Sequence, residues 1–211
     1  MTHHYIFDVD ETLYPSHHPF AKTIGTIGWD YLASLMDYDA DEARKIIENM
    51  RKTKQPVIQK LWDDHNIPIA EIIRYPEKLD YTQFESDELL RDQLHQLNGL
   101  KHIYTDGVQT HAQNVVTALG LTHVFENLFS TETANYYYKD SVNDFNHILT
   151  HIQTEGKSCT FVEDKVSNLK PAKASGMLTI WLTQSDENIP EWVDETAPNL
   201  PTWLQTELER T

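Results

Sequence analysis

The chain has 211 residues, a formal net charge of −16 and one cysteine, Cys159. This length suits one domain with an insertion or two small domains, with enough chain to bury a core. The acidic balance disfavours a broad nucleic-acid or anionic-membrane surface, because both need clustered Lys and Arg. A lone cysteine excludes an intrachain disulfide and suits a reducing cytosol. The start Met1–Tyr5 does not resemble a signal peptide and no apolar run could span a bilayer, so we expect a cytoplasmic protein.

The first element is a short apolar run, Tyr5–Val9, which predicts a buried strand. It ends in two carboxylates, Asp8 and Asp10. Open α/β sheets place their ligand crevice at such strand ends. Two like charges there cost stability unless a cation or a bound proton relieves them. A pair of solvated turn aspartates is the alternative interpretation.

A second strand of the same kind, Ser158–Val162, runs into Glu163 and Asp164. A helix over Val166–Ser175 follows and stops at Gly176, the residue type expected after a helix. A solvated acidic helix N-terminus is the alternative interpretation of this pair. Two strands that both end in paired carboxylates favour a shared site.

The remaining core elements alternate between strand and helix. Further strands are predicted at Lys101–Thr105 and Met177–Leu182, with a weaker one near Leu128–Ser130, and further helices at Val108–Leu119 and Ser141–Ile152. This alternation predicts a parallel sheet with right-handed crossovers.

The stretch from about Pro15 to Leu97 breaks the alternation, because its apolar residues recur at helical spacing. Asp39 with Glu42 predicts a capping box. We interpret the stretch as an all-helical insertion that returns to the core through a helix at 86–97. The last segment, 185–211, is interpreted as a surface wrap that packs Trp192 and Trp203 on the core and ends in a short helix near 203–208.

Four motifs occur in one order along the chain: Asp8-x-Asp10-x-Thr12, a strand ending in Thr105, Lys139, and a strand ending in Glu163-Asp164. This order resembles the haloacid dehalogenase superfamily. Three segments look most like its pyrimidine 5′-nucleotidase-like branch: Asp10–Pro15, His111–Leu121 and Glu163–Met177. The resemblance implies an α/β fold with a Rossmann-like parallel-sheet core, residues 1–14 and 92–211, and an all-helical C1-type cap, residues 15–91, inserted after the first strand.

The resemblance also implies roles for the acidic residues. Asp8 would be the nucleophile and a metal ligand, and would form an aspartyl-phosphate intermediate. Asp10 would bind the metal through its backbone carbonyl and serve as general acid and base. Asp164 with Glu163 would complete the site for Mg²⁺, which prefers oxygen ligands.

By the same resemblance, Thr105 would bind the phosphoryl oxygens together with backbone N–H groups near Glu11 and Asp106, and Lys139 would balance the charge of Asp8 and the phosphate. Two residues depart from the family pattern. Asp106 stands where Asn is common, and Asp140 stands where Pro is common; the three tyrosines at 136–138 are also unusual. These departures leave room for an altered substrate or a slow enzyme.

The expected function is Mg²⁺-dependent hydrolysis of a small phosphorylated metabolite, such as a pyrimidine nucleoside 5′-monophosphate, with neither nucleic acid nor membrane as partner. A sugar-phosphate phosphatase or a phosphomutase remains open, because these differ mainly in the cap. A 2-haloacid dehalogenase is disfavoured, since it needs neither a metal nor Asp10. The alternative from another class is a low-activity binding or regulatory protein on the same fold. The sequence also leaves open whether the protein is a monomer or a homodimer.

Overall fold

The structure, a computed structural model, describes residues 2–51, 57–133, 139–185 and 188–210. The chain divides into two compact units, a core unit of Met1–Ser16 with Phe84–Thr211 and a helical unit of His17–Gln83. The sequence-based boundaries, 14/15 and 91/92, differ from these mainly at the return to the core. Helix α5 (Glu88–Gln96) lies wholly in the core unit, where Gln93 donates a 3.1 Å hydrogen bond to the carbonyl of Pro201.

The core unit contains a six-stranded sheet in the order β3-β2-β1-β4-β5-β6, and every neighbouring pair is parallel. The strands are β1 (His4–Phe7), β2 (Leu100–Tyr104), β3 (Asn127–Phe129), β4 (Cys159–Glu163), β5 (Leu178–Leu182) and β6 (Glu195–Ala197). The predicted α/β fold with a Rossmann-like parallel sheet is confirmed. Because the strands are parallel, their carboxyl ends meet at one edge of the sheet.

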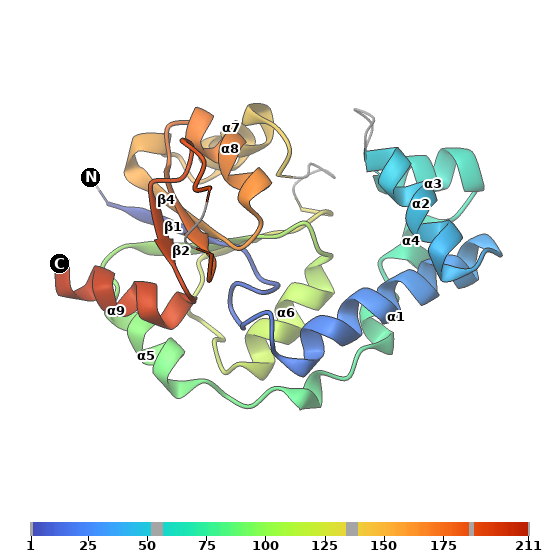
Figure 1. Ribbon diagram of the computed structural model, residues 1–211, viewed down its shortest axis with the longest axis horizontal. Helices are drawn as coiled ribbons and strands as arrows, with labels where there is room; N and C mark the ends of the chain where they lie inside the picture. Colours follow the sequence, from blue (N-terminus) through green and yellow to red (C-terminus); the bar gives the residue numbers. More distant parts are fainter. Residues whose placement is uncertain (1, 52–56, 134–138, 186–187, 211) are drawn as a thin grey trace. The chain divides into compact units, whose positions relative to one another are not determined.

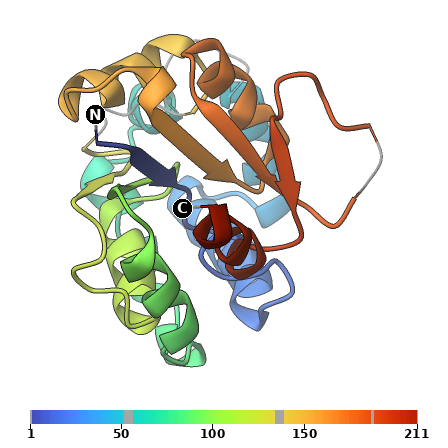
Figure 2. The ribbon, with the colours of Figure 1, turned by 90° about the vertical axis from the view of Figure 1, so that its left-hand side faces the viewer.

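Helices cover both faces of this sheet (Figures 1 and 2). Helices α7 (Val142–His151) and α8 (Val166–Ala174) lie on one face. Helices α5, α6 (Gln109–Ala118) and α9 (Leu200–Arg210) lie on the other. Among the described helices, none is long and apolar enough to cross a membrane.

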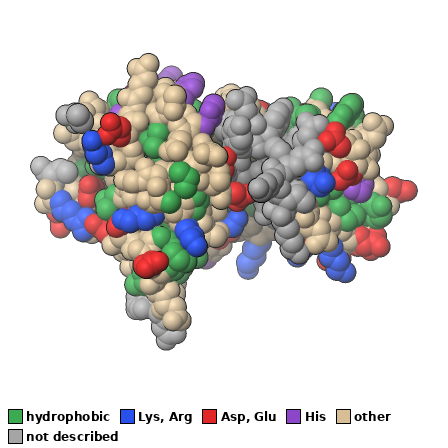
Figure 3. Space-filling view, turned by 90° about the horizontal axis from the view of Figure 1, so that it is seen from above, with side chains coloured by type: hydrophobic (Ala, Val, Ile, Leu, Met, Phe, Trp, Pro, Cys, Tyr) green, Lys and Arg blue, Asp and Glu red, His purple; other side chains and the backbone are tan. Residues whose placement is uncertain are grey.

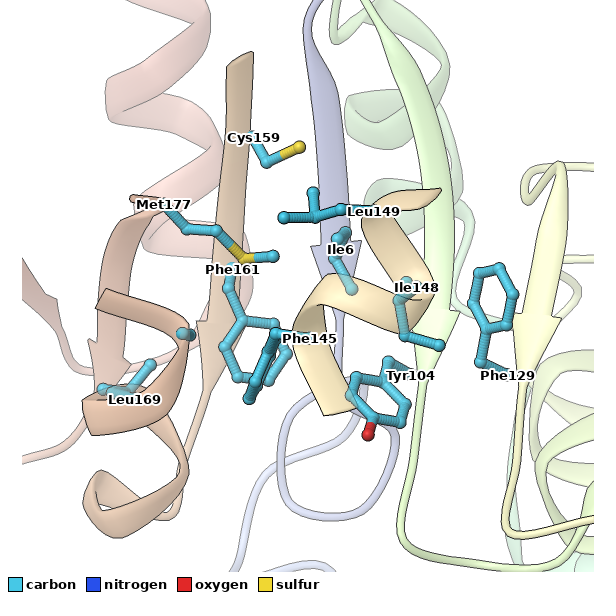
Figure 4. Packing of buried hydrophobic residues seen from close by; sticks show 11 residues of the cluster. Ile6, Tyr104, Phe129, Phe145, Ile148, Leu149, Cys159, Phe161, Leu169 and Met177 are labelled. Carbon is cyan, nitrogen blue, oxygen red and sulfur yellow. The ribbon is translucent and has the colours of Figure 1, made fainter. Parts of the chain in front are cut away.

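The residues of β1 alternate between the two faces, as the period of two in a strand requires. Ile6 points into a buried cluster in which Phe145 of α7 meets Phe161 of β4, with ring centroids 5.1 Å apart (Figure 4). Phe7 points to the opposite face and meets Trp203 of α9 at 6.4 Å. Burial on both faces explains why β1 reads as a continuous apolar run.

The prediction for the last segment was wrong in one respect, because it contains the edge strand β6. This strand has three residues, Glu195–Ala197, and no apolar run, so only its pairing with β5 marks it. Helix α9 is also longer than expected. The predicted packing of the tryptophans is confirmed: Trp203 is 3% exposed, and Trp192 packs against the cluster of Figure 4.

The helical unit contains no strand in its described residues. Its helices are α1 (Pro19–Met36), α2 (Ala40–Arg51), α3 (Val57–His65) and α4 (Ile69–Ile72), followed by 3-10 turns at Tyr75–Lys78 and Tyr81–Gln83. The predicted capping box is present: the backbone N–H of Glu42 donates to Asp39 Oδ1 at 2.8 Å, and the backbone N–H of Asp39 donates to Glu42 Oε2 at 3.3 Å. Tyr31 links α1 to the carbonyl of Glu71 at 2.8 Å.

Candidate active site

The carboxyl ends of β1 and β4 bring Asp8 and Glu163 to one buried ammonium group. The Nζ of Lys139 donates hydrogen bonds to Asp8 Oδ1 and, at 2.7 Å, to Glu163 Oε2. All three side chains are almost fully buried, and the Nζ also lies 5.8 Å from the ring centroid of Tyr104. The Asp8 backbone N–H continues the pairing of β1 with β4 through the carbonyl of Val162. The fold therefore joins three residues from distant motifs.

Three carboxylates converge at this edge. One oxygen from each of Asp8, Glu163 and Asp164 lies within 4.8 Å of the others. All the donors are oxygens, which suit a hard divalent ion such as Mg²⁺. Of the described ammonium groups, Lys139 pairs with two of these three carboxylates, Asp8 and Glu163, so a cation fits the charge balance of the cluster.

The two members of the second acidic pair have different surroundings. Glu163 Oε2 accepts from Asn168 Nδ2 at 3.1 Å as well as from Lys139, and its Oε1 accepts from the Lys165 backbone N–H at 3.1 Å. The Asp164 side chain shares a hydrogen bond with Glu163, and the Asp164 backbone carbonyl accepts from Trp181 Nε1 at 2.8 Å. Asp164 is also the more exposed of the pair.

The pKa values reflect the excess of negative charge. Burial, followed by repulsion from Glu163, raises the pKa of Asp8 well above its ordinary value and raises the pKa of Asp164 to about 8. Burial also opposes the charge of Glu163, but the Lys139 ammonium and several hydrogen bonds hold the pKa of Glu163 below its ordinary value. Burial opposes the ammonium too, yet Asp8, Glu163 and Asp106 hold the pKa of Lys139 well above its ordinary value.

Asp10 lies apart from the convergent carboxylates and has its own donors. Its Oδ1 is 2.8 Å from His111 Nε2 and accepts from the Tyr14 hydroxyl at 2.6 Å. Burial raises the pKa of Asp10, but the attraction and hydrogen bond of His111, together with the Tyr14 bond, outweigh it and leave the pKa lowered. The next residue, Glu11, has a left-handed backbone (φ +58°), which turns the chain sharply after Asp10.

Thr105 and Asp106 organise the loop after β2. The Thr105 Oγ1 accepts from the Gly107 backbone N–H at 2.9 Å, so the hydroxyl proton can still be donated elsewhere. Asp106 Oδ1 accepts from the backbone N–H of Lys139 at 3.0 Å. An Asn would offer the same acceptor, so the departure from Asn adds only a negative charge, which helps to raise the pKa of Lys139.

Of the other departures, Asp140 is exposed, and the tyrosines at 136–138 lie outside the described residues. Four supporting residues had no predicted role: Tyr14, His111, Asn168 and Trp181. Three of them fall in segments that carry the family resemblance, but no local pattern marks their partners.

The visible described surface carries acidic and basic side chains interspersed among uncharged ones (Figure 3). No broad basic patch occurs on the described part of that face.

Three comparisons with known proteins bear on this arrangement. A family model described as haloacid dehalogenase-like hydrolase matches residues 2–176. A search of curated proteins produced no match. Among solved structures, CbbY from Rhodobacter sphaeroides in complex with phosphate has a TM-score of 0.66 at 14% identity, covering 99% of this chain and 100% of its own.

Two further structures show the same likeness. The HAD-hydrolase YfnB from Bacillus subtilis, bound to magnesium, has a TM-score of 0.65 at 16% identity, with 98% of each chain covered. A 2-haloacid dehalogenase from Pseudomonas syringae pv. Tomato DC3000 has a TM-score of 0.62 at 16% identity, covering 100% of this chain and 99% of its own. At such low sequence identities these structures show only that the fold is shared. The family model, in contrast, matches most of the sequence and shows the family. The chain belongs to the haloacid dehalogenase-like hydrolases.

Proposed function

We propose that the protein is a Mg²⁺-dependent phosphomonoester hydrolase that acts through an aspartyl-phosphate on Asp8. The observation that carries the proposal is the convergence of Asp8, Glu163 and Asp164, of which the first two are buried and bonded to the ammonium of Lys139. Bound there through Asp8, Asp164 and the Asp10 carbonyl, with Glu163 close by, Mg²⁺ would offset the repulsion between the carboxylates and a phosphate and polarise the phosphoryl oxygens.

The remaining chemistry belongs to the chain's own residues. An Asp8 carboxylate oxygen attacks phosphorus, the bond from phosphorus to the leaving oxygen breaks, and that oxygen takes a proton from Asp10. Water then attacks phosphorus, Asp10 takes a proton from the water, and the bond from phosphorus to Asp8 breaks to release inorganic phosphate. Thr105 donates its hydroxyl proton to a phosphoryl oxygen, and Lys139 counteracts the rise in the pKa of Asp8 and holds its carboxylate in place.

The alternative chemistry is dehalogenation, which needs one nucleophilic carboxylate and no metal. Two features favour phosphoryl transfer. Asp10 is a second carboxylate with two hydrogen-bond donors of its own, and the neighbouring cluster has more carboxylates than ammonium groups. Two structural neighbours, one bound to magnesium and one in complex with phosphate, agree with this choice. The presence of Asp8 and Lys139 in direct contact also favours an active enzyme over a binding protein.

A turnover assay separates these chemistries. Phosphate release from p-nitrophenyl phosphate is measured with excess Mg²⁺ and with chelator, and chloride release from 2-chloropropionate is measured in parallel. We expect phosphate release that the chelator abolishes and no chloride release. Chelator-insensitive chloride release with no phosphate release would refute the proposal in favour of a dehalogenase.

For the substrate, we propose a pyrimidine nucleoside 5′-monophosphate. The support is the resemblance of Asp10–Pro15 and the two later segments to the pyrimidine 5′-nucleotidase-like branch. The proposed catalytic residues of the core unit act at phosphorus and do not distinguish between leaving groups. We therefore expect substrate specificity to come from the helical insertion. The strong net negative charge and the buried Cys159 suit a cytoplasmic enzyme for small metabolites.

A comparison of kcat/KM across UMP, CMP, AMP, GMP and hexose phosphates tests this choice. We expect UMP or CMP to rank first. A hexose phosphate preferred tenfold over every nucleotide would contradict the nucleotidase assignment and leave the phosphatase assignment intact.

A further inference from the structure

Two side chains of the core unit form hydrogen bonds with the Asp10 carboxylate, both at the same oxygen, Oδ1. His111 lies in the first turn of α6 and is fully buried, and its Nε2 is 2.8 Å from Asp10 Oδ1. The hydroxyl of Tyr14 donates to the same oxygen, while the Tyr14 ring packs edge-on against Phe84 with centroids 5.0 Å apart. The Asp10 side chain nevertheless remains 31% exposed. The carboxylate is thus anchored on one side and accessible on the other.

The donors at this oxygen follow from its chemistry. Oδ1 accepts hydrogen bonds both in the ionised carboxylate and in an acid that carries its proton on Oδ2, so in both forms His111 can donate a proton from Nε2 and Tyr14 can donate its hydroxyl proton. Among the described residues, both hydrogen bonds to the Asp10 side chain go to Oδ1. An oxygen that already accepts two hydrogen bonds is the poorer site for a transferable proton. The proton that Asp10 gives and takes therefore belongs on Oδ2.

Anchoring matters because the terminal torsion of an aspartate is broad and, without partners, lets the two oxygens exchange places. A general acid must come within about 2.6–3.2 Å of the atom that it protonates. Two donors on Oδ1, one from α6 and one from the loop after β1, remove this freedom.

We propose that His111 and Tyr14 are positioning residues that hold Asp10 by Oδ1 and so present Oδ2 to the leaving oxygen and then to the attacking water. This inference rests on the proposed function, since it takes Asp10 to be the acid and base of a phosphatase. It adds residues for which the sequence predicted no role.

The test is the dependence of kcat/KM on the leaving group, measured with Mg²⁺ present. p-Nitrophenolate leaves without a proton, whereas an alkoxide needs one, so only an alkyl phosphate depends strongly on Asp10. His111→Phe, which keeps an aromatic ring and removes the donor, should lower kcat/KM for an alkyl phosphate by about 10²-fold, the scale of a misplaced catalytic group. The loss for p-nitrophenyl phosphate should be only a few-fold. Tyr14→Phe keeps the ring against Phe84 and should act in the same direction more weakly.

Two controls separate positioning from folding. In an Asp10→Asn background, His111→Phe should leave the ratio of the two kcat/KM values unchanged, because its effect passes through Asp10. His102→Gln alters another buried histidine, which lies in the middle of β2 and bonds to His4 at the start of β1, and it should change kcat/KM for both substrates equally.

Equal losses on both substrates in His111→Phe and Tyr14→Phe, or a leaving-group effect that persists without the Asp10 carboxylate, would overturn the inference and leave the phosphatase assignment standing. An Asp10→Asn variant with an unchanged ratio would instead remove the acid role of Asp10. A wild-type protein that hydrolyses neither phosphate overturns both proposals.

Discussion

The two ends of the central strands bury polar side chains in opposite ways. Toward the amino ends, which we call the histidine end, His4 and Asn127 begin β1 and β3, and His102 lies in the middle of β2. Asn127 Nδ2 donates to His102 Nδ1 at 3.0 Å, so His102 carries its proton on Nε2 and donates it to His4 Nδ1 at 3.0 Å. These neutral groups satisfy one another. Burial, followed by the neighbouring His4 and His151, lowers the pKa of His102 to about 4, which keeps it neutral.

The carboxyl ends, which we call the acidic end, comprise Asp8, Lys139, Glu163 and Asp164. Here three carboxylates converge, the Lys139 ammonium pairs with two of them, and the pKa values of Asp8 and Asp164 are raised. At the histidine end of the sheet the buried polar groups are thus hydrogen-bonded to one another, whereas at the acidic end the negative charge exceeds the positive charge. The difference teaches that hydrogen-bond partners alone do not mark a ligand site in this fold, whereas an excess of buried charge of one sign does.

The largest expected effect comes from removing the nucleophile at the acidic end. Asp8→Asn should lower kcat by on the order of 10⁴-fold or more, because covalent catalysis is lost. Asp10→Asn should lower kcat by about 10²–10⁴-fold through loss of the acid and base. Phosphate release under saturating Mg²⁺ measures both losses, and a near-wild-type rate in Asp8→Asn would exclude the covalent mechanism. The Mg²⁺-induced rise in melting temperature should survive better in Asp10→Asn, whose proposed ligand is the backbone carbonyl.

The next effect concerns stability. Lys139→Met removes the ammonium and leaves Asp8 and Glu163 buried without their partner, which should lower the free energy of unfolding by about 3–5 kcal/mol at pH 8. The loss should shrink at pH 5, since the carboxylates can then take up protons. Urea unfolding at both pH values measures it, with the exposed Lys157→Met as the matched control. A loss no larger than that of the control would show that Lys139 does not hold the acidic end together.

Mg²⁺ should stabilise the acidic end in a pH-dependent way. The pKa of Asp164 is about 8 in the folded chain against about 3.9 in an unfolded one. Between these values the folded state holds a proton that the unfolded state has lost, so without metal this group makes stability fall as pH rises from about 4 through about 8. Mg²⁺ displaces that proton, and at 100 times its Kd it adds about 2.7 kcal/mol.

Melting temperatures at pH 5.5, 7.0 and 8.5, with Mg²⁺ and with chelator, measure this dependence. The rise caused by Mg²⁺ should grow with pH, and Asp164→Asn should stabilise the metal-free protein at pH 8.5 and weaken the response to Mg²⁺. An equal Mg²⁺ effect at all three pH values would speak against proton displacement.

The smallest effect on stability is expected at the histidine end, where the pH dependence of the free energy of unfolding is opposite in sign to that of Asp164. The folded pKa of His102 is about 4 and the unfolded value is about 6.5, so the unfolded state binds the extra proton between them. Stability from this group is therefore lost as pH falls from about 6.5 through about 4. His102→Gln should lower the free energy of unfolding by about 1–3 kcal/mol at pH 7 and weaken the acid dependence, with no change in the response to Mg²⁺. Melting curves from pH 4.5 to 7 test this, and a lost Mg²⁺ response would show that the two ends are coupled.

The sequence by itself determined the fold class and the ingredients of the site. The apolar runs of β1 and β4 can be recognised because both faces of these strands are buried, and each run ends in carboxylates, which are costly to bury without partners. Two helix ends could also be predicted from local sequence. Gly120 and Gly176 follow α6 and α8 with positive φ angles of +73° and +87°, which glycine adopts without strain. Such signals depend only on residues close together in the chain.

Only the tertiary structure decided which distant groups meet. His111 and Asp10 are separated by 101 positions, and no local pattern joins them. The contact of Lys139 with Glu163, and the bond from its backbone N–H to Asp106, likewise exist because parallel strands deliver their carboxyl ends to one edge. The short strand β6 was missed for the same reason, since three residues without an apolar run become a strand only beside β5. Periodicity reports burial along one segment, whereas hydrogen bonds and charge balance depend on partners that the folded chain brings from elsewhere.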